Sequence, residues 1–220
     1  MGEDGRLAMG HEDTVATLLE RFGRTYADEA GIRLRDTPSP LYRLLVLTTL
    51  SSVRIGADLA VAAARELSAA GLRTPKAMAA SDWQSRVDAL GRAHYVRYDE
   101  STATALGRGA ELLLDRWRGD LRRLRDEADG EPAQVAGLIR VFPRIGPVGA
   151  GIFCREAQAV WPTLRPFFDD RALRTAAELG LPDSPGALAG LTRPRDLARL
   201  AAALTRVGLS RTRPGDLLAA

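Results

Sequence analysis

Hydrophobic residues recur along most of the chain at the spacing of helices that bury one face. The range 102–117 shows this most clearly, with Leu106, Ala110, Leu113 and Trp117 in line along one side. No convincing alternation of apolar and polar residues, as in a half-buried strand, appears. The pattern therefore predicts an all-α protein of about ten helices.

Caps and helix breakers set the expected boundaries of these helices. A first helix is expected over 11–30, before the breaking sequence DTPSP. Thr74 is expected to cap a helix that begins at Pro75, because proline suits the first helical position. Ser81 or Asp82 is expected to cap the next helix.

The stretch FPRIGPVGAGIF, residues 142–153, interrupts this helix-forming sequence with three glycines and two prolines. Apolar residues at helical spacing precede and follow it, so a tight hairpin between two helices is expected. Gly146 and Gly149 can take positive φ and allow a close backbone approach. The amides from Gly146 to Ala150 would lack intrahelical acceptors at the positive end of a helix dipole, which suits a phosphodiester. The alternative is a plain connection between core helices.

Composition narrows the candidate functions. The 220 residues are 45% hydrophobic, enough for a core. The single cysteine, Cys154, excludes an intrachain disulfide and any site built from several thiolates, and His11 and His94 are too few to suggest a metal motif. We expect no cofactor and no metal. No run of about 18 apolar residues occurs and the first residues lack a signal peptide's apolar region, which predicts a cytoplasmic protein without membrane contact.

The basic residues are almost all arginine, with Lys76 as the sole lysine. Arginine binds phosphate well but cannot supply the amine of a Schiff base. The formal net charge of +3 is compatible with nucleic-acid binding and does not require it.

The motif FPRIGPVGA resembles the helix–hairpin–helix of the endonuclease III family of DNA glycosylases, whose usual form is Leu-Pro-Gly-Val-Gly-x-Lys-x-Ala. Downstream, PFFDDRALR is similar to the family segment in which an apolar pair precedes a catalytic aspartate, here Asp169. The order and spacing of such segments match from about Pro38 to Gly180. The resemblance implies the two-lobed fold of the HhH-GPD superfamily. The expected bounds are a six-helix barrel lobe over 38–155, the hairpin at about 135–158, and a second lobe from 1–37 and 156–220.

The resemblance also implies an activity and a partner. The partner would be double-stranded DNA with a modified or mispaired base, flipped into a cleft between the lobes. Asp169 would stabilise positive charge on the sugar and orient the attacking water. The alternative role for Asp169 is a helix N-cap only. Asp170 is either the true cap or, if the register is shifted by one residue, the working carboxylate. A nucleoid-associated monomer is expected.

Several positions depart from the family pattern. Val148 stands where bifunctional members carry a lysine, so the resemblance implies a monofunctional glycosylase. The family's four-cysteine iron–sulfur motif is absent from the sequence. Arg144 replaces a hairpin glycine, and either distorts the turn or adds a phosphate contact. The residues expected at the DNA backbone are Arg144, Gly146, Val148, Gly149 and Ala150.

Two further segments are expected near the base. Val53 or Arg54 would take the place of the family's glutamine, which fills the gap left by the flipped base. In the polar loop 91–101, three side chains could contact the base by stacking or hydrogen bonding: His94, Tyr95 and Tyr98. The alternative is that the two tyrosines are half-buried core residues and that His94 lies on the surface.

Two other functions remain open. A non-catalytic DNA-binding or lesion-sensing protein would keep the fold without the activity. A bifunctional glycosylase with lyase activity would need another amine, such as Lys76 or the N-terminus.

Overall fold

A computed structural model describes residues 10–210, 212 and 214–219, and in these ranges the regular secondary structure is helical, with no strand. The expected all-α class is confirmed. Within the same ranges, no helix combines the length and the apolar character that crossing a membrane requires.

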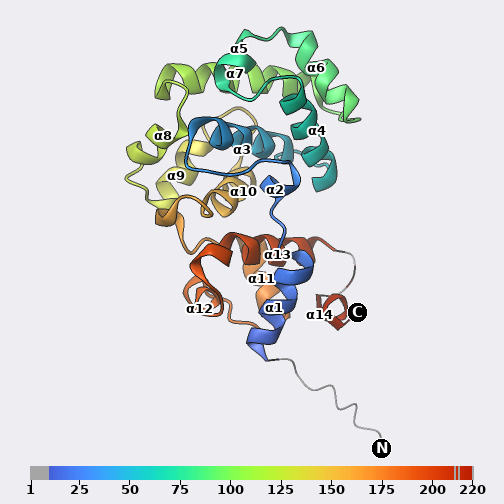
Figure 1. Cartoon of the computed structure of the whole chain (residues 1–220), viewed down its shortest axis with the longest axis vertical. Coiled ribbons are helices and arrows are strands. Elements are labelled where there is room, and N and C mark those ends of the chain that lie inside the picture. The colour runs from blue at the N-terminus through green and yellow to red at the C-terminus, as the bar shows by residue number, and fades with distance from the viewer. Residues whose placement is uncertain (1–9, 211, 213, 220) are drawn as a thin grey trace, which may run out of the picture. The chain divides into compact units, whose positions relative to one another are not determined.

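The chain folds into two compact units (Figure 1). The central unit is Thr25–Arg165, and the terminal unit combines Met1–Arg24 with Pro166–Ala220. Both boundaries lie nearer the chain ends than the expected bounds of 38 and 155. The physical reason is that the segments on both sides of these bounds are bonded to the end of the helix 147–157. Glu156 accepts a hydrogen bond from the amide of Ala27, and Arg165 donates to the carbonyl of Gln158.

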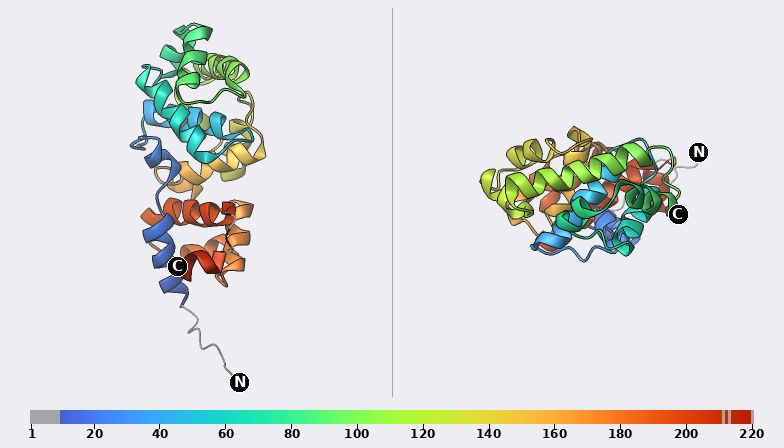
Figure 2. Two further views of the ribbon diagram at one scale, coloured as in Figure 1. Left: turned by 90° about the vertical axis from the view of Figure 1, so that its right-hand side faces the viewer. Right: turned by 90° about the horizontal axis from the view of Figure 1, so that it is seen from above.

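The central unit is built around one apolar helix, α3, which packs against α4, α7, α8 and α10. Leu41, Leu44, Leu47 and Leu50 of α3 are fully buried. The right-hand view of Figure 2 shows the long helix α7 running across this unit. Its elements are α2 (Tyr26–Glu29), α3 (Pro38–Ser51), α4 (Ala57–Ala69), α5 (Pro75–Ala80), α6 (Trp83–Arg92), α7 (Asp99–Trp117), α8 (Leu121–Glu127), α9 (Pro132–Ile139), α10 (Pro147–Ala157) and the 3-10 turn η1 (Pro162–Leu164).

Local sequence signals account for several of these helix starts. The Thr74 hydroxyl accepts the amide of Ala77, as expected of a cap. Asp82 caps α6 by accepting the amide of Ser85, so Asp82 and not Ser81 fills this role. Proline occupies the first helical position of α3, α5, α9 and α10, where its missing N–H costs no hydrogen bond.

Two expected boundaries were wrong. The single helix expected over 11–30 is divided, because α1 ends at Phe22 and the Thr25 hydroxyl caps the separate helix α2. The loop expected over 91–101 is shorter, because α6 continues to Arg92 and α7 already begins at Asp99.

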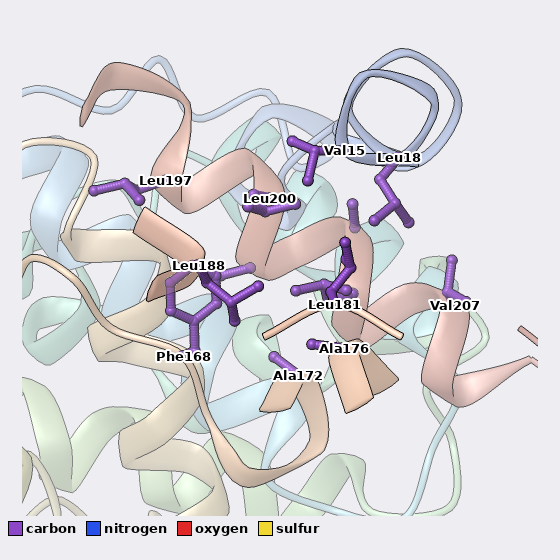
Figure 3. Close-up of a cluster of buried hydrophobic side chains, with 13 residues drawn as sticks. Val15, Leu18, Phe168, Ala172, Ala176, Leu181, Leu188, Leu197, Leu200 and Val207 are labelled. Carbon is purple, nitrogen blue, oxygen red and sulfur yellow. The ribbon is translucent and has the colours of Figure 1, made fainter. Parts of the chain in front are cut away.

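The terminal unit packs α13 between α1 and α11 (Figure 1). Its core joins Val15 and Leu18 of α1 to Leu200 of α13 and to Phe168, which precedes α11 (Figure 3). Phe168 therefore anchors the residue that follows it, Asp169. The elements are α1 (His11–Phe22), α11 (Asp170–Glu178), α12 (Pro185–Ala189), the 3-10 turn η2 (Pro194–Asp196), α13 (Leu197–Leu209) and α14 (Pro214–Ala219).

A buried carboxylate joins α10 to α2 in the central unit. Glu156 is 1% exposed, and one of its oxygens accepts the amide of Ala27 at 2.9 Å. Its other oxygen lies 3.8 Å from Nε of the equally buried Arg155. Burial outweighs the attraction of Arg155 and raises the pKa of Glu156.

This raised pKa gives an expected pH dependence of stability. The folded protein holds the Glu156 proton more tightly than the unfolded chain. The contribution is therefore complete below the ordinary pKa of about 4.5 and is lost as pH rises through the folded value. Glutamine does not titrate, so Glu156→Gln should flatten the decline of the free energy of unfolding with pH, measured by urea unfolding. The exposed control Glu111→Gln should keep the wild-type profile, and an unchanged profile in Glu156→Gln would contradict this account.

Candidate functional site

The hairpin between α9 and α10 is fixed to the core of the central unit by its own apolar residues. Phe142 and Ile145 are buried, and the Phe142 ring stacks on Trp117 of α7 with 5.6 Å between centroids. The Ile145 amide donates to the Phe142 carbonyl at 3.1 Å and closes the turn. The connection therefore has a defined conformation.

The strained residue of the turn is Arg144 and not one of the glycines. Arg144 has φ of +67°, in the left-handed region, which costs an L-residue about 1 kcal/mol relative to glycine. Gly146 has φ of −93° and Gly149 lies within α10, so neither uses the positive φ that the sequence suggested. The Arg144 guanidinium donates to the Ser101 hydroxyl and lies 5.6 Å from the centroid of the Tyr98 ring. These contacts hold the turn against the start of α7.

Gly149 is required because the end of α3 comes close to α10. A Cβ at this position would overlap the Ser52 hydroxyl and lie 3.0 Å from Cγ2 of Ile145. The Ser52 hydroxyl is held in place by donating to the Thr48 carbonyl at 2.7 Å. The turn that follows α3 therefore adjoins the hairpin. Its residues Val53, half-buried, and Arg54, exposed, follow Ser52 directly.

Two backbone amides at the start of α10 have no acceptor among the described residues. They belong to Val148 and Gly149, while Pro147 has no N–H, and the amide of the N-cap residue Gly146 has no acceptor there either. The Ala150 amide donates to the Gly146 carbonyl at 3.0 Å. The expectation that this amide is free to bind the DNA backbone was therefore wrong. The Val148 side chain is 77% exposed and carries no amine. Two unpaired amides at the positive end of a helix dipole can bind an anion.

The three residues expected to contact a base lie in different environments. Tyr95 is 1% exposed and its hydroxyl donates to the Leu50 carbonyl at 3.2 Å, so it is a core residue. His94 is exposed and takes positive φ at the end of α6. Tyr98 is half-buried, and its ring contacts both Arg97 and Arg144. The alternative in which Tyr95 is a core residue is therefore correct, and Tyr95 does not contact a base.

Asp169 belongs to the terminal unit and caps α11. Its carboxylate accepts the amide of Ala172 at 2.9 Å, whereas Asp170 is the first helical residue and is exposed. The alternative in which Asp170 is the cap is wrong. The capping bond and the buried Phe168 beside it give the Asp169 carboxylate a fixed position within the terminal unit.

Two arginines and the cysteine near the C-terminal end of α10 make contacts within the protein or are buried. Arg155 is buried beside Tyr26, and Arg165 donates to the carbonyls of Gln158 and Ala159. Burial raises the pKa of the Cys154 thiol to about 12. In the described ranges, no group of three residues could hold a metal ion.

No family model matches the chain, and a search of the curated proteins finds no match. The candidate site therefore rests on the geometry described above and on the sequence motif.

Two contacts of the hairpin were not predicted from the sequence. Ser52 and Ser101 touch it from the end of α3 and the start of α7. The one sequence signal for the first contact is the small size of Ser52 in the turn after α3. A glycine in one helix often faces a small residue of a neighbouring segment. Nothing in the sequence pattern pointed to Ser101.

The close approach of Gly149 to Ser52 gives an expected stability pattern. Gly149→Ala should lower the free energy of unfolding by about 1–3 kcal/mol, because the new methyl group overlaps the Ser52 hydroxyl. Ser52→Ala alone should cost about 1 kcal/mol or less. The double variant should be about 1 kcal/mol more stable than the sum of the two effects, since the alanine at 52 removes the overlapping atom.

Urea unfolding of the four proteins in this cycle measures the coupling. Gly137→Ala is the matched control, because a Cβ at this exposed position of α9 meets nothing within 4 Å. It should stabilise the protein slightly, as alanine favours helix over glycine. Additive effects of Gly149→Ala and Ser52→Ala would contradict the contact.

Proposed function

We propose that this protein is a DNA N-glycosylase of base excision repair, probing duplex DNA for a damaged or modified base. The observation that carries the proposal is the pair of unpaired amides, Val148 and Gly149, at the start of α10. They follow a tight hairpin whose sequence resembles a DNA-binding motif, and a phosphodiester oxygen is the anion that such amides would bind.

The proposal extends to the fold and the setting. Within the all-α class, the proposed fold is the two-lobed HhH-GPD arrangement, and the all-α structure and the hairpin support it. The proposed partner is double-stranded DNA with a modified or mispaired base, bound by a nucleoid-associated monomer in the cytoplasm. Arg144 of the hairpin turn, half-buried, and Arg54 of the turn after α3, exposed, supply positive charge in the central unit.

The proposed chemistry is hydrolysis of the N-glycosidic bond. The base leaves with the electron pair of that bond, and positive charge develops on the sugar. The Asp169 carboxylate stabilises this charge and accepts a proton from the attacking water, whose oxygen bonds to the sugar carbon. The products are the free base and an abasic site. Val148 offers no amine for an imine, so strand cleavage does not follow.

The second candidate function is a DNA-binding or lesion-sensing protein without catalysis. The observation in its favour is that the Asp169 carboxylate already serves as the N-cap of α11. A bifunctional enzyme would instead need an amine such as that of Lys76, which is exposed in the first turn of α5.

A panel of labelled duplexes, each with one modified base, separates these functions. The bases are uracil, mismatched thymine, hypoxanthine, oxidised pyrimidines, oxidised guanine and alkylated purines. Each reaction is divided, and one half is treated with hot alkali. Cleavage only after alkali is expected. Cleavage without alkali, trapped by borohydride, would indicate a lyase, and binding without any cleavage would indicate the non-catalytic protein.

Asp169→Asn tests the carboxylate on the duplex that the panel selects. Asparagine is also a good N-cap, so α11 and the thermal stability should be preserved. Base release should fall about 100-fold or more while DNA affinity is retained. The control is Asp170→Asn, which removes the neighbouring exposed charge and should leave the rate within about twofold. Equal rates for the wild type and Asp169→Asn would remove Asp169 from the mechanism.

Arg144→Gly tests whether the guanidinium contacts a phosphate. Glycine suits the left-handed φ of this position, so the turn should be retained. The slope of log affinity against log salt should become shallower by about 0.9, the amount for one lost phosphate contact. Arg92→Ala removes an exposed arginine that pairs with Glu66, and it should leave the slope unchanged. Identical slopes for the wild type and Arg144→Gly would exclude this contact.

A further inference from the structure

The surface of the central unit is hollowed between the starts of α6 and α7. The hollow has a volume of about 420 Å³ and lies beside the turn residue Arg144. Its wall combines an aromatic platform with charged and hydroxyl groups. Besides Tyr98, the lining residues are Trp83, Arg97, Asp99, Glu100, Ser101 and Thr104.

Trp83 is presented to solvent by the local sequence. Asp82 caps α6, so Trp83 becomes the first helical residue and remains 40% exposed. Its indole N–H donates to the Thr104 hydroxyl of α7 at 3.1 Å, and that hydroxyl donates to the Glu100 carbonyl at 3.0 Å. The indole is therefore held at one edge while much of its surface stays accessible.

A buried arginine keeps the two helices of the hollow together. Arg86 of α6 is 8% exposed and donates to the Ala103 carbonyl of α7 at 2.9 Å and to the Ser81 carbonyl at 2.7 Å. The bond to Ala103 links α6 to α7 through a guanidinium that is itself buried, so separating the two helices would cost this guanidinium an acceptor. The hollow is consequently formed before any ligand arrives.

The hollow is connected to the hairpin by a chain of contacts. The Ser101 hydroxyl accepts a hydrogen bond from Arg144, and the guanidinium groups of Arg97 and Arg144 lie 5.2 and 5.6 Å from the centroid of the Tyr98 ring. Arg97, which lines the hollow, and Arg144 of the hairpin thus both contact the Tyr98 ring. The carboxylates of Asp99 and Glu100 balance this charge at the start of α7.

This chemistry fits a nucleobase better than a bare anion. Two carboxylates disfavour a phosphate inside the hollow, whereas an indole stacks on any base and the carboxylates accept hydrogen bonds from amino groups of bases. Arg97 at the edge of the hollow and Arg144 of the hairpin can hold the attached phosphate. A paired base cannot reach the indole, because its faces are covered by its neighbours in the duplex.

We infer that this hollow binds one unpaired base of the DNA that the hairpin holds, with Trp83 as the stacking platform. The inference rests on the proposed DNA binding and adds a second contact for the nucleic acid, in the central unit. It assigns no role in hydrolysis to the residues of the hollow.

Tryptophan fluorescence provides a direct test, because Trp83 differs from the other tryptophans. Trp117 and Trp161 are 2% and 0% exposed, so an added ligand can stack only on Trp83. The probes are a short duplex with a one-base bulge and the same duplex fully paired. The bulged duplex should quench the emission and the paired duplex should not, while anisotropy of labelled DNA reports binding of both.

Variants at Trp83 connect the signal to affinity. Trp83→Leu should abolish the quenching and weaken binding of the bulged duplex about tenfold, with the paired duplex within about twofold. Trp83→Phe should abolish the quenching but keep most of the affinity, because phenylalanine still stacks. Leu209→Ala, at an exposed apolar residue of the other unit, should change neither.

The failures of the two ideas are distinguishable. Binding of both duplexes without quenching, and with wild-type affinity in Trp83→Leu, would overturn the base site and leave DNA binding intact. Binding of neither duplex would overturn the base site together with the proposed function.

Discussion

The approach of α10 to the end of α3 is the constraint on which the candidate site depends. Gly149 lies against the Ser52 hydroxyl with no room for a side chain. This contact fixes the start of α10 and brings the turn after α3 beside it. The stacking of Phe142 on Trp117 and the bond from Arg144 to Ser101 hold the other side of the hairpin against α7. Two helices, α3 and α7, therefore position one short turn.

The chemistry of the hairpin follows from this packing. Once α10 begins at Pro147, the amides of Val148 and Gly149 have no acceptor in the described part of the chain and can be satisfied by an anion. Arg144 keeps a left-handed conformation that glycine would adopt at lower cost, and its guanidinium bonds to Ser101 at the start of α7. A strained residue with a charged side chain in the same turn as unpaired amides is the ground on which DNA binding is proposed.

Sequence reasoning succeeded where the structure is decided locally. The caps at Thr74 and Asp82 and the first-position prolines depend on neighbouring residues only, and the glycines and prolines of residues 142–153 are enough to predict a break between two helices. It failed where distant elements decide. The core position of Tyr95 depends on the carbonyl of Leu50, and the positive φ of Arg144 depends on how the turn packs against α7. The exposed ring of Trp83 acquires significance only because α7 places Thr104 beside it.

The most direct test of the central claim, that the hairpin amides hold the DNA backbone, is an NMR titration of backbone amides with a short duplex. The amide signals of Val148 and Gly149 should move most, because each gains a phosphate acceptor. The Ala150 amide should move less, since it already donates to Gly146. If DNA binds while the Val148 and Gly149 signals stay in place, the hairpin is not the phosphate site and the account is contradicted.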